Sequence, residues 1–481
     1  MHTLFIKSIL KLCAYLHTKS DHFKMQVTRH ILFTIILLFS FSHTHSQNYT
    51  SYSGFKDDTI LLSRMQKSMQ QKFAKDSIDV TGEYKKQIQK FYREQLNFLN
   101  DMFVYRLIVT SVSANKYLDD IVNEIVKKNP VLQPLNPRPM LLRDWSPNAF
   151  TTGDGTIVFN LGLFTRMNNE SQVAFVLCHE LAHLYLGHRD KAINQYVNTV
   201  YSDDFQKELK KIKKDEYEKN KRLDALEKGI VFTSSRHSRQ HESESDSMAL
   251  VFMSNTFFDT HQSLTALALL DIIDENALEM ENILKKHFSF PDFLFKKNWL
   301  KKEQGFFGGP SKSEVDKKMA DSLKTHPDCI SRIKSLTPAV DKISVQNKLF
   351  PISETSFKQQ QDTLKYEMIE LLWRKEYISR ALFEALQLLE SRPGDIYLMG
   401  TVGACLNKIY TYQKEHRLGK IIDNPSPYIK KDYNTLLKFI EALRLDEIAG
   451  IAYHFLNNNA RPLNTNERFE KALKDSKENF K

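Results

Sequence analysis

Residues 179–188 read His-Glu-Leu-Ala-His-Leu-Tyr-Leu-Gly-His. On a helix, side chains four positions apart lie on the same face, so the imidazoles of His179 and His183 can reach one metal ion. Glu180 is offset from that pair, so it can contact a water at the metal without binding the metal itself. This spacing is typical of a zinc metallopeptidase, and it predicts that a helix forms the centre of the fold.

The residues around this motif are apolar. Residues 171–178 and 181–186 contain few polar side chains, so we expect a buried helix. Buried imidazole and carboxylate groups cost several kcal/mol each, roughly, unless they are hydrogen-bonded or bound to a metal. The structural alternative is a pair of core histidines satisfied by backbone groups. Cys178 beside the motif is either a small buried side chain or a thiol that makes a metal site sensitive to oxidation.

A second segment supplies the third ligand that a zinc site needs. Residues 238–246 read Ser-Arg-Gln-His-Glu-Ser-Glu-Ser-Asp and precede an apolar, helix-like run. Because Glu242 and Asp246 are four apart, they share a helix face. Glu242 can then bind the metal, while Asp246 accepts a hydrogen bond from the other ring nitrogen of a ligand imidazole. Glu244 and His241 are the competing ligands. An exposed acidic helix start is the structural alternative.

Four segments, in order, resemble the gluzincin peptidases, the family that includes the CAAX prenyl protease and the heat-shock membrane protease HtpX, with their soluble periplasmic relatives. They are residues 148–150 with 153–159 and 162–164, residues 170–188, residues 238–246, and residues 325–327 with 332–333. The chain has Cys178 and Ser245 where the family usually has alanine. Both replacements are small and leave the proposed ligands in place.

The resemblance implies an α+β, mainly helical fold, in which a catalytic domain over residues 114–336 contains a small β-sheet and the active-site helix. It implies one zinc ion, held by His179, His183 and Glu242. Zinc would lower the pKa of a water, and Glu180 would act as general base. The family's Thr-His-Pro segment makes His326 a candidate oxyanion donor, an inhibitory fourth ligand, or only part of a helix-entry turn.

The strand-forming residues 155–161 predict a strand close to the active helix. If this strand lies at a sheet edge, an extended substrate can pair with it, and Asn148, Gly155 and Val158 become candidate substrate-binding residues. Backbone pairing tolerates many sequences, so the expected substrates are unfolded or flexible proteins. A strand that only supports the active helix is the alternative.

The N-terminal region indicates export. Arg29 and His30 precede an apolar run over residues 31–41, which ends in small and polar residues, as a secretory signal peptide does. We therefore expect a leader and signal peptide over residues 1–46, with Met25 as a possible true start and the mature chain in the periplasm or secreted. An uncleaved membrane anchor is the alternative.

Composition excludes some classes of function. The net charge of +10 comes without a basic cluster interleaved with aromatic residues, so we expect no nucleic acid partner. Association with an anionic membrane surface is compatible with this charge. The chain has 4 Cys, which predicts no disulfide framework and leaves one bond between Cys178 and Cys329 open.

The remaining segments are expected to be helical. Residues 47–113 predict an N-terminal helical segment, and the charged residues 203–228 predict a solvated helix or a lid. Residues 337–456 contain helix-like periods at 357–373, 376–389, 396–410, 434–443 and 446–456. Residues 377–393 resemble half of a tetratricopeptide-like hairpin, and this helical module is a candidate surface for a protein partner. Residues 457–481 predict a polar, mobile tail.

Together these features predict an exported zinc endopeptidase with a possible role in envelope protein quality control. A non-catalytic, zinc-stabilised chaperone or adaptor that binds partners through its helical module is the alternative from another class. An exopeptidase with the same zinc chemistry is the second alternative.

Overall fold

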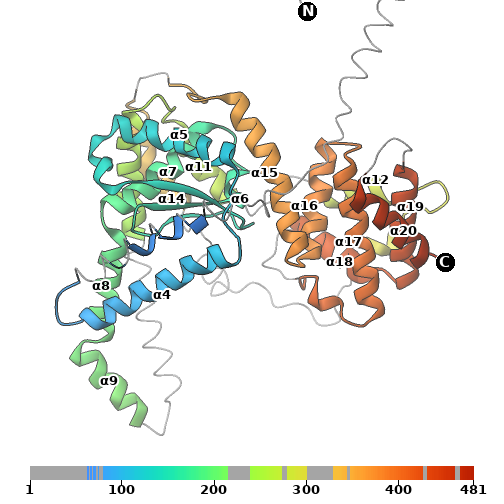
Figure 1. The fold of residues 1–481 in the computed structure, drawn as a ribbon, viewed down its shortest axis with the longest axis horizontal. Coiled ribbons are helices and arrows are strands. Elements are labelled where there is room, and N and C mark those ends of the chain that lie inside the picture. The colour runs from blue at the N-terminus through green and yellow to red at the C-terminus, as the bar shows by residue number, and fades with distance from the viewer. Residues whose placement is uncertain are drawn as a thin grey trace, which may run out of the picture.

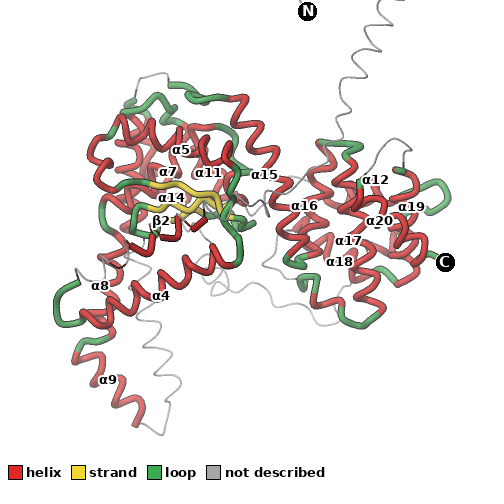
Figure 2. Tube along the Cα trace, viewed as in Figure 1, coloured by secondary structure: helices red, strands yellow, loops and turns green. Residues whose placement is uncertain are grey.

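The computed structural model describes residues 80–214, 239–272, 279–300, 329–343, 347–425, 431–460 and 466–481, with residues 62–63, 65–67, 69–71 and 74 before them. Most of these residues are helical, and a small sheet lies among the helices of the first half (Figure 1, Figure 2). The predicted α+β, mainly helical fold is therefore confirmed. The expected leader and signal peptide (1–46), residues 215–228 and His326 lie outside the described residues.

The three strands of the sheet are β1 (Arg138–Leu142), β2 (Ala149–Thr151) and β3 (Thr156–Asn160). Their order is β1–β3–β2, with β1 parallel and β2 antiparallel to β3. The turn between β2 and β3 contains Gly155, whose φ is +93° and whose absent Cβ would lie 2.4 Å from the carbonyl oxygen of Leu135. Only glycine fits this position, because its backbone needs both the positive φ and the close approach.

Strand β1 begins at the end of a segment that contains several prolines. Residues Pro130–Leu135 form the short helix η1, but Pro139 lies in β1. The N–H of Arg138 donates to the carbonyl oxygen of Gly155 over 2.7 Å, so the nitrogen of Pro139 faces away from β3. Proline is tolerated there because that side of an edge strand needs no ladder hydrogen bond.

Alternate residues of the sheet pack into different layers. Leu141, Ile157 and Phe159 point into a core shared with α5 (Val112–Lys128) and α7 (Glu170–Tyr185). Met140, Leu142 and Val158 point into a second core shared with α4 (Lys85–Val104) and α8 (His188–Val200). The sheet therefore lies between α5 and α7 on one side and α4 on the other (Figure 1).

The N-terminus of α7 is fixed by a buried carboxylate. Glu170, the first residue of this helix, accepts a hydrogen bond from the Tyr117 hydroxyl over 2.8 Å. It also accepts from the backbone N–H groups of Ile352, over 2.8 Å, and Ser353, over 2.7 Å. A carboxylate also suits the positive end of the helix dipole. Two segments that lie far from α7 in the sequence thus set its position.

Further helices complete this half of the molecule. They are α6 (Leu161–Phe164), α9 (Asp203–Lys214), helical residues 239–254, α11 (Gln262–Ile272) and α14 (Cys329–Val340). Helix α9 follows α8 and projects away from the body (Figure 1). Helices α11 and α14 pack on each other, and α11 also packs on α7.

The second half is a bundle of helices. It contains α15 (Glu354–Arg374), α16 (Ile378–Ser391), α17 (Ile396–Lys414), the short η3 (Leu418–Lys420), α18 (Lys431–Ala442), α19 (Leu445–Asn459) and α20 (Glu467–Asn479). These bounds confirm the helices predicted between 357 and 456. Helix α16 packs on α17, and α17 packs on α19 and α20. The resemblance of these helices to tetratricopeptide repeats stays a prediction.

Two parts of this bundle differ from the sequence expectation. Residues 280–300, which the sequence placed in the catalytic domain, form α12 (Met280–Phe288) and η2 (Lys297–Leu300), and both pack on α18. The Phe288 ring stacks on Phe439 with centroids 5.9 Å apart, and Trp299 is buried against the same ring. The bundle is therefore not contiguous in the sequence.

The expected polar tail after residue 457 is wrong for its second half. Helix α20 docks on α17 by burying Phe469, Ala472 and Ser476. These residues recur at helical spacing, which gives an otherwise polar segment one face that can pack. The backbone of Phe469 lies so close to Gly400 that a Cβ there would be 2.8 Å from its nitrogen. The glycine thus permits close helix contact.

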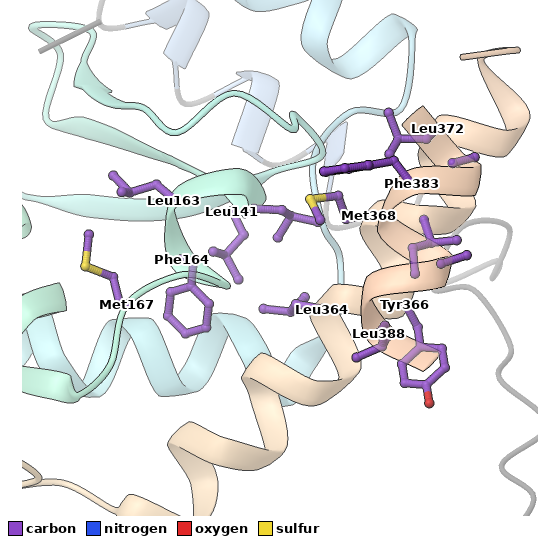
Figure 3. Packing of buried hydrophobic residues seen from close by; sticks show 14 of the residues in the cluster. Leu141, Leu163, Phe164, Met167, Leu364, Tyr366, Met368, Leu372, Phe383 and Leu388 are labelled. Atoms are coloured by element: carbon purple, nitrogen blue, oxygen red, sulfur yellow. The ribbon is translucent and has the colours of Figure 1, made fainter. Parts of the chain in front are cut away.

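Helix α15 joins the two halves (Figure 3). Its residues Leu364 and Met368 belong to the same buried core as Leu141 and Phe164 of the sheet half. A buried ion pair also crosses this contact, because Arg143 donates to the Glu367 carboxylate over 2.5 Å and both side chains are at most 5% exposed. The two halves therefore share apolar and ionic contacts.

Cys178, Cys329 and Cys405 are buried free thiols, so the bond between Cys178 and Cys329 that the sequence left open is not formed. Burial raises the pKa of the Cys178 thiol, which favours the small buried side chain over the reactive thiol. Within the part of the chain that the structure describes, no helix has the length and apolar character of a membrane span.

Candidate metal centre

Helix α7 positions three polar side chains in an apolar setting. His179 and Glu180 are 8% and 7% exposed, and His183, one turn after His179, is half-buried. Residues Val173–Leu177 before them are also buried. The helix therefore forms as predicted, with its imidazoles on one face and largely shielded from solvent.

Glu242 of the helical residues 239–254 completes a triangle with the two imidazoles. Its Oε2 lies 3.4 Å from His179 Nε2, and its Oε1 lies 3.3 Å from His183 Nε2. The two Nε2 atoms are 3.0 Å apart. One ligand atom from each side chain lies within 4.8 Å of the other two. The structure thus brings together the three residues that the sequence proposed as metal ligands.

Asp246 lies behind His179, one turn after Glu242. Its Oδ1 is 2.9 Å from His179 Nδ1, on the side of the ring opposite the ligand triangle. Burial alone would lower the pKa of His179, but Glu242 and Asp246 raise it to about 10 when no metal is bound. Asp246 therefore has the place that the sequence proposed for it, where it fixes which ring nitrogen carries the proton.

Arg332 of α14 ties the two carboxylates together. Its Nε and Nη2 each donate to Asp246 over 2.7 Å, and its Nη1 lies 2.9 Å from Glu242 Oε2. Burial would raise the pKa of Asp246, but the hydrogen bonds from this guanidinium and from His179 lower it. The sequence placed Arg332 in a family-like segment without giving it a role. No local sequence pattern indicates the contacts of Arg332 with Asp246 and Glu242, because they depend on how α14 packs against the other helices.

His183 is held by a different kind of partner. His188 Nδ1 lies 3.0 Å from His183 Nδ1, and His188 Nε2 lies 3.1 Å from Glu244 Oε2. The Ser245 hydroxyl is 3.2 Å from the same Nδ1 of His188. Burial lowers the pKa of His188 to about 4 against the effect of Glu244. The sequence left Glu244 open as a competing metal ligand. In the structure its carboxylate contacts His188 and not the ligand triangle.

His241, the other competing ligand, lies away from the triangle. Its ring stacks on His188, with centroids 4.2 Å apart and planes 12° from parallel. The chain turns between α7 and α8 at Gly187, which has a φ of +65°. This left-handed conformation suits glycine and ends α7, so that His188 points back toward His183.

Glu180 lies between the ligand pair and the edge of the sheet. Burial raises the pKa of its carboxylate against the lowering effects of His179 and His183. The carboxylate also accepts a hydrogen bond from the backbone N–H of Thr151 in β2. A carboxylate with a raised pKa is a better proton acceptor, which is what a general base needs.

Strand β2, and not β3, forms the sheet edge beside α7. The expectation that a substrate pairs with residues 155–161 is wrong, because β3 is the central strand. Val158 pairs with Met140 on one side and with Phe150 on the other. The carbonyl oxygens of Asn148 and Gly155 accept from Asn160 and Arg138. The sequence could not reveal this order, because strand composition does not specify strand neighbours.

The outer edge of β2 has defined polar groups. The carbonyl of Asn148 and the N–H of Thr152 bond to β3, so by alternation the N–H and C=O groups of Ala149 and Thr151 point outward. The end of this strand is fixed by Arg189 of α8, whose Nη1 donates to the Thr152 carbonyl over 2.6 Å. Gln95 of α4 donates to the same oxygen over 3.2 Å.

The donor set fits a zinc ion. Both imidazoles are engaged at Nδ1, which leaves both Nε2 atoms directed at Glu242. Two imidazole nitrogens and one carboxylate are the ligands of a common class of catalytic zinc site. Three carboxylates, those of Glu180, Glu242 and Asp246, lie around the imidazoles, and one guanidinium, that of Arg332, contacts the last two. A dication would neutralise this excess of negative charge.

The chain was compared with known protein families and with curated proteins. Residues 113–340 match the sequence model of peptidase family M48. The matched segment contains all four segments that carried the resemblance described above. A comparison with curated proteins found no match.

Proposed function

We propose that the chain is a zinc-dependent endopeptidase, because residues 113–340 match peptidase family M48, whose members are zinc metallopeptidases. One observation carries the proposal. The Nε2 atoms of His179 and His183 and the carboxylate of Glu242 converge, while Glu180 lies beside them without joining the triangle. A structural zinc site has no use for such a base.

When bound, zinc supplies a Lewis acid that activates a water and polarises a carbonyl. Glu180 accepts the proton of the attacking water and then transfers it to the nitrogen of the leaving amine. The N–H of Thr151 holds this carboxylate in place. Asp246 and Arg332 hold His179. His326 as an oxyanion donor or inhibitory ligand stays a prediction, because it lies outside the described residues.

The outward edge of β2 supports a peptide substrate in extended form. The outward N–H and C=O groups of Ala149 can pair with the backbone of an added strand, beside the carboxylate of Glu180. Since backbone pairing ignores side chains, we propose unfolded or flexible proteins as substrates. Export through the segment at residues 31–41, and a role in envelope protein quality control, belong to the same proposal.

The proposal is tested with an unfolded protein such as reduced, alkylated casein. We expect internal cleavage that a chelator stops and added zinc restores. Glu180→Gln is expected to lower kcat by about 10²–10⁴-fold, the usual contribution of a general base, while zinc content stays equal to wild type. Glu94→Gln on the exposed face of α4 is the matched control, because its side chain is 59% exposed.

Three outcomes would change the assignment. Cleavage by Glu180→Gln at the wild-type rate would contradict the mechanism. If mass spectrometry of the casein products shows only terminal trimming, the chain is an exopeptidase. A wild-type protein that binds zinc and prevents aggregation of unfolded casein without cleaving it would favour the chaperone or adaptor alternative.

A further inference from the structure

His188 lies outside the His-Glu-x-x-His motif but contacts it directly. It is 3% exposed, and its Nδ1 lies 3.0 Å from Nδ1 of His183. Its other ring nitrogen lies 3.1 Å from Glu244 Oε2. His183, His188 and Glu244 thus form a chain that runs from the ligand triangle to the surface, where the Glu244 side chain is 41% exposed.

The positions of the protons in this chain follow from the chemistry of imidazole. A neutral imidazole carries one N–H and one lone pair. If His183 offers the lone pair of Nε2 to a metal, its N–H is at Nδ1 and donates to His188 Nδ1. His188 must then carry its own proton at Nε2, which donates to the carboxylate of Glu244. Each donor in the chain therefore meets an acceptor.

The two imidazoles of the motif are consequently held in different ways. Asp246 contacts His179 directly and is itself fixed by Arg332. For His183 the corresponding place is taken by His188, and the carboxylate lies one residue further out. The stacked ring of His241 and the hydroxyl of Ser245 hold the plane of His188. These contacts leave His188 little freedom to turn away.

We propose that His188 is a positioning residue, which keeps the lone pair of His183 Nε2 directed at the metal by accepting the proton of His183 Nδ1, with Glu244 fixing the tautomer of His188. This inference rests on the proposed function, since it concerns the same metal centre. Partners of this kind typically change metal affinity by about 10–100-fold when they are removed.

The test compares two variants of the full chain. His188→Phe keeps a ring that can stack on His241 but has no acceptor. His188→Asn carries an amide oxygen close to the position of Nδ1 and can still accept. We expect zinc affinity, measured by competition with a coloured chelator, to fall about 10–100-fold in His188→Phe and to be largely retained in His188→Asn. The visible spectrum of bound cobalt(II) should change only in the first.

Zinc affinity and a cobalt spectrum in His188→Phe that equal those of wild type would overturn the proposal. If that variant does not fold, Glu244→Ala replaces it, because this side chain is largely outside the core. Weaker zinc binding by Glu244→Ala supports the proposal, and unchanged binding overturns it. His261→Ala, on a half-exposed side chain away from the centre, is the control. Wild-type protein that binds zinc without cleaving casein refutes the proposed function and leaves this inference standing.

Discussion

The clusters around Arg332 and Arg468 are both buried, charged and crossed by hydrogen bonds, but only one is suited to a metal. In the bundle, Glu370 accepts from Arg468 over 2.7 Å, from the Tyr397 hydroxyl over 2.8 Å and from Arg374 over 2.9 Å. Every donor there points at the carboxylate. Around Arg332, by contrast, three acceptor atoms point at one another.

This difference identifies a site better than burial or charge does. In the bundle, two guanidinium groups surround the carboxylate of Glu370, so its negative charge is already compensated within the protein. Around Arg332, one guanidinium contacts two carboxylates, and the Nε2 atoms of two imidazoles converge with the carboxylate of Glu242. A converging surplus of acceptors is what a cation relieves. The two clusters should therefore respond differently to metal.

The largest expected effect on stability comes from removing the carboxylate of the cluster around Arg468. Glu370→Ala leaves the Arg468 guanidinium buried without its carboxylate, and removal of one partner of a buried ion pair costs about 3–5 kcal/mol. We expect this loss of unfolding free energy in urea titrations, equally with and without a chelator. Glu376→Ala, whose side chain is 54% exposed, should cost only about 0–1 kcal/mol. A chelator-dependent loss in Glu370→Ala would contradict the assignment of this cluster as purely structural.

Metal removal should affect only the other cluster. Zinc at 100 times its Kd stabilises the folded state by about 2.7 kcal/mol. A chelator should therefore lower the melting temperature of wild type by about 3–4 °C, measured by calorimetry. Glu242→Gln lacks one ligand and should show no such shift. If chelator and zinc shift wild type and Glu242→Gln equally, Glu242 is not a ligand.

A smaller effect tests the support of His179. Asp246→Asn replaces the carboxylate at His179 Nδ1 by an amide, and it also removes the partner of Arg332. Zinc affinity should fall by about 10–100-fold in a chelator competition. Asp204→Asn, at a side chain that is 99% exposed, should leave the affinity unchanged. Equal affinities in both variants would show that the carboxylate behind the imidazole is dispensable.

The smallest effect concerns protons. Without metal, the neighbouring carboxylates raise the pKa of His179 to about 10, so this imidazole is protonated at neutral pH. Zinc must displace that proton, and affinity should therefore rise with pH up to about 10, by at most about 1.4 kcal/mol per pH unit. Calorimetric titrations in two buffers of different ionisation enthalpy should detect the released proton. Binding without proton release would show that His179 is already neutral.

The sequence predicted the parts of the centre that local geometry determines. His179 with His183, and Glu242 with Asp246, are each one helical turn apart, so their shared faces follow from the helix alone. Arg332 and His188 were missed as functional residues because their contacts depend on how α14 and α8 pack. The order of the strands was missed for the same reason. Only tertiary packing decides which strand lies at the edge.

The same limit applies outside the centre. The apolar periods of α15 to α19 are strong, and their helices were predicted from them. Helix α20 has a narrow apolar face within a polar segment, so it was read as a tail. The aromatic side chains between 288 and 299 were assigned to the catalytic domain by their position in the chain, yet they pack on Phe439 of the bundle. Sequence order did not indicate which core they join.

The contacts of α15 have a practical consequence for anyone who shortens this protein. A fragment that stops at residue 340, where the family match ends, would keep Arg143 and Glu170 but lose Glu367, Ile352 and Ser353. Two buried charges would lose partners, and the apolar surface under Leu364 would meet water. Such a fragment should be poorly soluble when expressed by itself. Material for crystallography is better trimmed elsewhere, with α15 and the bundle left intact.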